Sequence, residues 1–249
     1  MRMPLEAIRK IKIYGYKKSF IYIFYEINRI VFCQLFLNSY SQKKEDIYID
    51  SLLKNKPKGF YVDVGAHDPT RFSNTKRFYN KGWSGINIEP DVNRFKMFED
   101  ERYRDINLNI GIGKKKSIMH FYKFIPNTLS TFSETEAKSY IKQNYELEKT
   151  TDVPIETLEQ ILDKYCEGKT IDFMSIDTEG FDTEVLMSNN WKKYKPTVIC
   201  IESVKHTMEN TSKRISLDQE GFLVSKGYIK KYDNNLNSIY LYSKGNNGT

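Results

Sequence analysis

The sequence predicts an α/β fold with a doubly wound, mostly parallel sheet of seven strands, and two stretches indicate it most directly. The apolar run 60–64 leads into a glycine, Gly65, and the apolar run 85–88 leads into an acid, Glu89. A helix-sized segment separates the two runs, which is typical of two parallel strands joined by a crossover helix. Apolar runs and helical segments continue to alternate afterwards, so we expect helices on both faces of the sheet.

The other elements are expected in chain order, starting with a polar helix and linker over 43–58 that leads to the first strand. Ser73-Asn74-Thr75 can cap or begin the next helix, because short polar side chains accept the free N–H groups of a first turn. The later elements are a helix from there to about Lys81, a helix over 90–101, strands over 106–110, 171–176 and 197–201, helices over 158–165 and 181–187, and an antiparallel pair within 228–242.

The segment 111–155 breaks this alternation. We expect a strand over 118–124, a turn-rich stretch over 126–131, and then a charged helical segment that continues through Lys149. An insertion at this place would lie over the crevice at the carboxyl ends of the strands, where such segments supply an acceptor pocket or a lid. A solvated hairpin and helix is the alternative.

The turn after the first strand indicates the ligand. Gly65 has no Cβ, so a ligand can approach the backbone there and meet the free N–H groups of the next helix. Glu89 follows Gly65 by 24 positions (89 − 65), near the roughly 20 residues that separate a nucleotide-binding turn from the carboxylate that binds ribose hydroxyls. The residues after Gly65 lack the further glycines of the dinucleotide fingerprint, which disfavours a nicotinamide cofactor.

Asp63 stands two residues before the glycine and suits a ligand with an ammonium group and no phosphate. Together with Glu89, this acid predicts S-adenosylmethionine (SAM) as the ligand, with Asp63 near its methionine end. Asn109 and Ile110 follow the third strand at the same edge of the sheet, and they are candidate contacts to the adenine. An ordinary buried strand that turns at a glycine is the alternative for Asp63-Val64-Gly65.

Several motifs occur in order along residues 40–245: Ser41-Gln42 with Asp46, Phe60-Tyr61-Val62-Asp63-Val64-Gly65-Ala66-His67-Asp68, Ser73-Asn74-Thr75, Gly82-Trp83 with Gly85, Ile88-Glu89-Pro90, Ser130-Thr131 and Ile176-Asp177-Thr178-Glu179-Gly180-Phe181. With these motifs the chain resembles the FkbM-type SAM-dependent methyltransferases. The resemblance implies the Rossmann-like sheet of the class I SAM-dependent methyltransferases, SAM as cofactor with His67 and Asn74 among its contacts, and O-methyl transfer to a hydroxyl of a sugar, a glycan or a related small molecule. The family more often carries Asn or another small polar residue in place of His67.

Acids at the ends of the fourth and fifth strands are candidates for catalysis and for binding the acceptor. Asp177 and Glu179 follow the run 171–176, and carboxylates beside a cofactor can orient an acceptor hydroxyl, accept its proton or hold a cation. A pair of acids favoured by the helix macrodipole is the alternative. Glu202 ends the fifth strand and is a candidate for binding the acceptor, and His206 could act as a base near neutral pH. The pattern allows a divalent metal without requiring one.

The net charge of +7 belongs to the N-terminal part of the chain. Residues 1–58 hold 12 Lys and Arg against 5 Asp and Glu, and the remainder holds 27 of each. We therefore predict an N-terminal helical segment over 1–58 and a methyltransferase domain over 59–245, with 111–155 as the insertion. A domain without net positive charge disfavours nucleic acid as a partner. A small molecule or a glycan is the expected acceptor.

Residues 20–37 carry an apolar stripe at helical spacing, but Glu26 and Arg29 would be costly in a bilayer core, so a spanning helix is not expected. The stripe within 1–37 could pack on the domain, join two copies in a homo-oligomer, or make peripheral contact with an anionic membrane. The alternative functions are a non-catalytic module that binds SAM or a nucleoside, and a membrane-associated assembly protein.

The cysteines indicate the compartment. The chain has three, far apart and without metal-ligand spacing, and they are expected to be reduced structural thiols: Cys33, Cys166 and Cys200. No secretory cleavage pattern precedes them. The sequence therefore predicts a cytoplasmic protein, with the inner face of the membrane as the alternative place.

Overall fold

The structure is a computed structural model that describes residues 31–203 and 212–243. After the helical residues 31–37, its elements are α2 (Glu45–Leu52), β1 (Phe60–Val64), α3 (Lys76–Asn80), β2 (Ser84–Ile88), α4 (Val92–Glu101), β3 (Ile106–Leu108), β4 (Gly111–Ile112), β5 (Ser117–Ile125), the 3-10 helix η1 (Asn127–Leu129), α5 (Glu134–Lys142), β6 (Glu146–Glu156), α6 (Leu158–Tyr165), β7 (Phe173–Ile176), α7 (Asp182–Met187), β8 (Val198–Glu202), α8 (Ser212–Ser225), β9 (Tyr228–Asp233) and β10 (Asn237–Tyr242).

The larger sheet has seven strands in the order β3-β2-β1-β7-β8-β10-β9. The five strands from β3 to β8 pair in parallel, and β10 runs antiparallel to both of its neighbours. The prediction of a seven-stranded, mostly parallel sheet is therefore confirmed. From β1 the chain adds β2 and β3 on one side, and it later adds β7 and β8 on the other side. In open α/β sheets a ligand binds beside the carboxyl ends of the strands at such a switch point.

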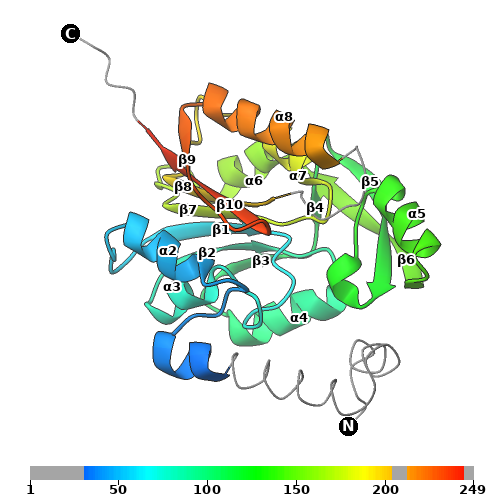
Figure 1. Cartoon of the computed structure of the whole chain (residues 1–249), viewed down its shortest axis with the longest axis horizontal. Helices are drawn as coiled ribbons and strands as arrows, with labels where there is room; N and C mark the ends of the chain where they lie inside the picture. The colour runs from blue at the N-terminus through cyan, green and yellow to red at the C-terminus, as the bar shows by residue number, and fades with distance from the viewer. Residues whose placement is uncertain (1–30, 204–211, 244–249) are drawn as a thin grey trace.

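Side chains of β1 alternate between the two faces of the sheet. Val62 and Val64 belong to the core covered by α6, α7 and α8, whereas Tyr61 belongs to the core beneath α2 and α3. All five residues of β1 are buried, as expected for a central strand of a sheet covered on both faces. Figure 1 shows the two groups of helices on opposite sides of the sheet.

A buried arginine holds the loop between β1 and α3. Arg102 is fully buried after α4, and its guanidinium donates to the carbonyl of Pro69 at 2.9 and 2.7 Å and to the hydroxyl of Ser73 at 3.0 Å. It also donates to the hydroxyl of Tyr61 at 3.0 Å. Because Tyr61 belongs to β1, these bonds attach the loop 65–75 to the central strand.

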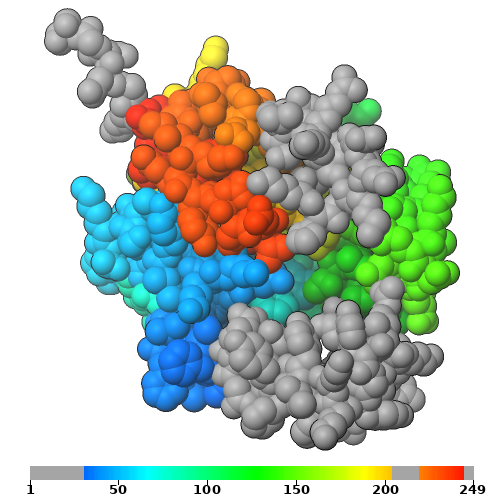
Figure 2. Space-filling view, in the orientation of Figure 1, coloured from blue at the N-terminus to red at the C-terminus, as the bar shows by residue number. Residues whose placement is uncertain are grey.

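A second, three-stranded sheet lies in the segment where an insertion is expected. Its strand order is β4-β6-β5, and β5 and β6 form a long antiparallel pair. This sheet and α5 lie at one end of the molecule, away from β9 (Figures 1 and 2). The prediction of a helical segment through Lys149 is wrong, because α5 ends at Lys142 and β6 begins at Glu146. Asn144 has a φ of 61°, which stops the helix, and the β-branched residues of β6 favour an extended chain.

The helix α8 is absent from the elements that the sequence predicts. Its residue Leu223 belongs to the main core, and Phe222 packs edge-on against Trp191 with 5.8 Å between the ring centroids. Charged and apolar residues alternate in this segment without a clear helical period. The helix therefore depends on its packing against the sheet more than on its own pattern.

The helical residues 31–37 present an apolar surface. Leu35 and Phe36 are each 73% exposed, and Phe36 stacks on Phe32 with 5.0 Å between the ring centroids. Residues 20–30 of the predicted stripe lie outside the described residues, so its contact with a membrane, a second copy or the domain stays a prediction. Within the described ranges, every helix is too short or too polar to cross a membrane.

Candidate active site

Residues from five neighbouring strands form one row at the carboxyl edge of the larger sheet. The last residues that these five strands pair with one another are in register: Leu108, Ile88, Val64, Ile176 and Ile201. The residues that follow them make up the row, in the order Asn109, Glu89, Gly65, Asp177 and Glu202. Since neighbouring strands lie about 4.8 Å apart, the backbones of Glu89 and Asp177, on either side of Gly65, are about 10 Å apart.

Gly65 ends β1 in a conformation that only glycine adopts easily. Its φ is +77°, and its N–H donates to the carbonyl of Ile88 at 3.0 Å. A Cβ at this position would lie 1.9 Å from the carbonyl oxygen of Asp177. The contact between two strand ends thus requires a glycine here, in addition to the ligand approach that the sequence suggests.

Gly65→Ala is expected to destabilise the fold by about 3 kcal/mol or more, for two reasons. The methyl group would force the ends of β1 and β7 apart, and alanine would have to adopt a left-handed backbone conformation. Thermal unfolding measures the loss. Gly168→Ala is the matched control, because Gly168 has a φ of +72° and nothing within 4 Å of an added Cβ. That variant should lose only about 1 kcal/mol. Equal losses at the two positions would contradict the close contact.

Two backbone N–H groups hold Glu89 in one orientation. The N–H of His67 donates to Oε2 and the N–H of Asp91 donates to Oε1, both at 2.7 Å. The side chain is 5% exposed, and burial raises the pKa of Glu89 to about 7 although both hydrogen bonds favour the charged form. Each carboxylate oxygen can accept a further donor, so Glu89 can bind two neighbouring hydroxyl groups.

His67 connects this acid to the insertion. Its φ is 54°, and its Nε2 lies 3.4 Å from Oδ1 of Asn127 in η1. Burial, with a smaller contribution from the charge of Arg94, lowers the pKa of His67. The ring is therefore neutral at pH 7, and its contact with a cofactor stays a prediction.

Asn109 and Ile110 follow β3 and make contacts within the protein near Glu89. The amide group of Asn109 donates to the carbonyls of Glu89 and Pro90 at 2.8 and 2.9 Å. Both of its protons are used in this way, so its contact with an adenine, which stays a prediction, would use Oδ1. Ile110 packs against the main core, and the apolar side chain is available to a ring only in part.

Asp63 and Asn74 lie on the face of the sheet that α3 covers. Oδ2 of Asp63 accepts from the hydroxyl of Thr75 at 2.7 Å, and the amide of Asn74 donates to the hydroxyl of Ser175 at 3.1 Å. Both side chains are buried, and burial raises the pKa of Asp63 to about 6. These contacts attach the start of α3 to the sheet. Binding of a cofactor by either residue stays a prediction.

Asp177 stands at the end of β7, next to the Gly65 turn. Its side chain is open to solvent, yet the surrounding protein and the carboxylates of Asp182, Asp63 and Glu45 raise its pKa to about 7. A carboxyl group with this pKa exists in both protonation states near neutral pH. It can therefore accept a proton from a substrate and release it afterwards.

Glu179 follows Asp177 in the same loop, with a φ of 50°. Its carbonyl accepts from the hydroxyl of Thr131 at 2.8 Å, and its side chain forms a hydrogen bond with Tyr140 in α5. Burial, together with the charges of Asp177 and other acids, raises the pKa of Glu179 well above its usual range. The Ser130-Thr131 motif thus connects the insertion to the loop after β7, which contains Asp177 and Glu179.

Several residues near this loop were not selected from the sequence. Asp182, Glu136 and Glu45 lie close enough to raise the pKa of Asp177 or Glu179. Only Asp182 could have been found from the sequence, because it is a further acid shortly after the strand 171–176. Glu136 and Glu45 come from segments distant in the chain. His206 lies outside the described residues, so its role as a base stays a prediction. Among the residues described, no group of three or more His, Cys, Asp or Glu side chains is placed to hold a metal ion.

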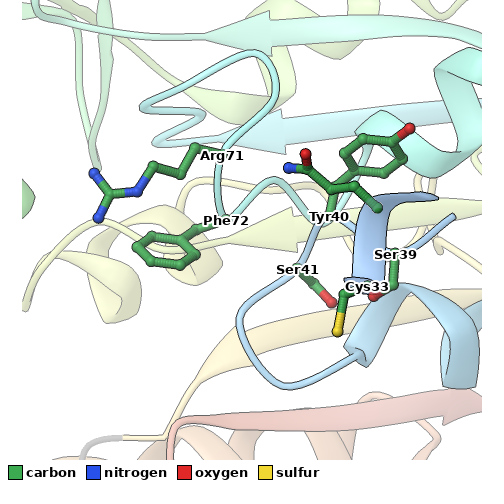
Figure 3. A pocket seen from close by; sticks show the side chains of 7 residues that line it. Cys33, Ser39, Tyr40, Ser41, Arg71 and Phe72 are labelled. Carbon is green, nitrogen blue, oxygen red and sulfur yellow. The ribbon is translucent and has the colours of Figure 1, made fainter. Parts of the chain in front are cut away.

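The Ser41 and Asp46 motif has a structural role. The hydroxyls of Ser39 and Ser41 donate to Oδ1 of Asp46 at 2.7 and 2.8 Å, and this anchors the chain before α2. A small cavity lies beside this anchor, between the N-terminal segment and the β1–α3 loop (Figure 3). It contains no residue of the row, and its lining includes Cys33, Ser39, Tyr40, Ser41, Arg71 and Phe72.

A family model described as "Methyltransferase FkbM domain" matches residues 63–228. Among solved structures, the chain is similar to the fibrillarin pre-rRNA processing protein of Methanococcus jannaschii (12% identity, 75% of this chain and 67% of that chain, TM-score 0.43) and to the methyltransferase domain of METTL16 (11%, 80% and 66%, 0.45). It is also similar to an O-methyltransferase of Bacillus cereus in complex with SAH (11%, 95% and 95%, 0.38). The chain spans about two thirds of the length of the first two. No curated protein matches the sequence significantly.

Proposed function

The chain belongs to the FkbM methyltransferase family, and we propose that it transfers the methyl group of SAM to a hydroxyl oxygen of a sugar, a glycan or a related small molecule. That it is a SAM-dependent methyltransferase follows from the family, and the acceptor is the part that we propose. The row at the sheet edge carries the proposal, because it places Glu89 and Asp177 on either side of the Gly65 turn.

The residues around the turn fit SAM. Glu89 presents a fixed, buried carboxylate with acceptor capacity left over, which suits the two hydroxyls of a ribose. Acids lie on the other side of the turn, where Asp177, Glu179 and Glu202 would face the acceptor and the methyl group to be transferred. When bound, SAM supplies a methyl group on a sulfonium, which is an excellent leaving group.

The protein would contribute position and a base. Holding the acceptor hydroxyl in line, with the reacting atoms about 3 Å apart, supplies much of the rate enhancement. Asp177 would accept the hydroxyl proton on its carboxylate, which its raised pKa of about 7 allows near neutral pH. Glu179 and Glu202 would orient the acceptor, and His206 is the alternative base.

Calorimetric titration with SAM, S-adenosylhomocysteine and NAD tests this function at its first step. We expect binding of the first two and none of NAD, because the turn lacks the glycines that admit a pyrophosphate. A screen of sugar and glycan acceptors by release of S-adenosylhomocysteine would follow. Binding of NAD alone, or of none of the three, would contradict the proposed cofactor site.

A further inference from the structure

Five acidic residues gather where the insertion meets the end of β7 and β8. We call them the acidic cluster: Glu136, Asp177, Glu179, Asp182 and Glu202. Glu136 belongs to α5, Asp182 begins α7, and Glu202 ends β8. The surrounding protein raises the pKa of each carboxyl group, and the charges of other cluster members raise it further for Asp177, Glu179 and Glu202.

Direct contacts hold the parts of the cluster together. Thr131 donates to the carbonyl of Glu179 at 2.8 Å, and Tyr140 forms a hydrogen bond with the Glu179 side chain. A Cβ added to Gly180 would lie 2.8 Å from Cγ of Glu136, so α5 packs directly on the loop after β7. The cluster is therefore built from the insertion and the loop after β7 together.

The cluster contains acceptor atoms that the protein does not satisfy. The Asp182 side chain is 1% exposed; its Oδ1 accepts from the N–H and the hydroxyl of Thr178 at 3.0 and 2.9 Å, but its Oδ2 has no hydrogen-bond partner. Oε2 of Glu136 is also buried without a partner. In the part of the chain that the structure describes, none of the five acids forms an ion pair with Lys, Arg or His. Buried acceptors left unpaired are costly, which indicates that a donor enters from outside.

The arrangement favours an organic cation over a bare metal ion. The carboxylates share one electrostatic field, yet among the described residues they do not converge on a metal-binding geometry. An ammonium group carries one positive charge and three N–H donors, so it can bind carboxylates that approach from several directions. Hydrogen bonds between an ammonium and carboxylates are among the stronger kinds in proteins.

We propose that the acidic cluster is a subsite for a protonated amino group of the acceptor, so that the substrate is an amino sugar or a comparable hydroxyl compound with an amine. This inference rests on the proposed function and names its substrate class. A protonated amine has no lone pair and cannot attack the methyl group, so the hydroxyl oxygen remains the nucleophile. The bound amine therefore helps to select the substrate and is not itself methylated. The subsite also explains why the insertion contributes an acid to the loop after β7.

Binding to the full chain saturated with S-adenosylhomocysteine tests the subsite. Calorimetry should show glucosamine, which is an ammonium at pH 7, binding about tenfold or more tightly than neutral N-acetylglucosamine. Glu136→Gln should remove this preference and leave the affinity for S-adenosylhomocysteine unchanged. Glu134→Gln is the matched control, because Glu134 lies on the same helix but pairs with Lys138 at the surface, and it should keep the preference.

Three outcomes would overturn the subsite. The first is equal binding of the two sugars, or binding of neither, by a protein that still binds S-adenosylhomocysteine; this would leave the proposed function intact. The second is a loss of S-adenosylhomocysteine affinity in Glu136→Gln, which would assign the cluster to the cofactor. The third is competition between Mg²⁺ and glucosamine, together with a loss of Mg²⁺ binding in Glu136→Gln. This result would assign the cluster to a metal.

The stability of the ligand-free protein gives an independent reading. If the cluster awaits an external cation, Glu136→Gln removes repulsion between like charges and should raise the melting temperature. If a cation of this chain already neutralises the cluster, the same variant would leave that cation unpaired and lower the melting temperature. A lower melting temperature would therefore also overturn the proposal, whereas Glu134→Gln should change it little.

Discussion

Asp177→Asn is expected to lower kcat by about a hundred- to ten-thousand-fold, the range that a general base contributes. Asparagine has nearly the same shape as aspartate, but it cannot accept the proton of the acceptor hydroxyl. The affinity for SAM should change little, because Glu89 and the turn on the other side of Gly65 stay in place. Single-turnover kinetics with SAM and an identified acceptor would separate the chemical step from binding.

The pH profile gives a second reading of the same residue. Asp177 acts as a base only when it is ionised, so kcat should rise with pH and level off above a pKa of about 7. In Asp177→Asn the remaining activity should lose this rise. A profile that is the same in both proteins would assign the proton transfer to another group, with His206 as the next candidate.

Asp163→Asn is the matched control for this substitution. Asp163 lies in α6, half-exposed, and pairs with Lys193 at 2.6 Å. Surface ion pairs of this kind contribute about 0–1 kcal/mol to stability, so the variant should keep full activity. A comparable loss of kcat in Asp163→Asn would mean that the effect at Asp177 reflects general damage to the fold.

The sequence predicted the sheet and its row of edge residues because both depend on local patterns. Each buried parallel strand reads as a short apolar run, and the residue after the run marks the carboxyl edge. Glu89 and Asp177 could therefore be placed at one edge before any contact was known. Register then brings the strand ends together, since Val64 pairs with both Ile88 and Ile176.

The face of the sheet to which a strand residue points is harder to predict from the sequence. Asp63 precedes Gly65 by two residues and shares the face of Tyr61, beneath α2 and α3, and its contact with the ligand stays a prediction. Its carboxylate accepts from Thr75 there. Alternation along a strand places Asp63 and Val64 on opposite faces, and the sequence alone does not say which face is open to a ligand.

The contribution of α5 to the acidic cluster could not be predicted, because Glu136 meets the other members through tertiary packing. Glu136 precedes Gly180 by 44 residues (180 − 136) and reaches it only because α5 folds back on the loop after β7. The misassigned segment around Lys149 has the same cause. Its charged residues suit a helix as well as a strand, and the long pairing of β6 with β5 decides the outcome.

Glu89→Ala should weaken SAM binding by at least about a hundredfold, because two hydrogen bonds to a charged acceptor are lost at about 1.5–3 kcal/mol each. Calorimetric titration with SAM and S-adenosylhomocysteine measures the loss, which should be similar for the two ligands because both contain the ribose. Glu99→Ala, at an exposed position of α4, is the matched control and should bind both ligands normally.

The pH dependence of binding separates a direct contact from a structural role of Glu89. Burial raises the pKa of Glu89 to about 7, and only the ionised form accepts from both ribose hydroxyls. SAM affinity should therefore increase from pH 6 to pH 8, and Glu89→Gln should abolish this increase because glutamine does not titrate. If Glu89 only supported the N–H groups of His67 and Asp91, the variants would lower the melting temperature, and SAM affinity corrected for the unfolded fraction would stay the same. That result would remove Glu89 from the cofactor site.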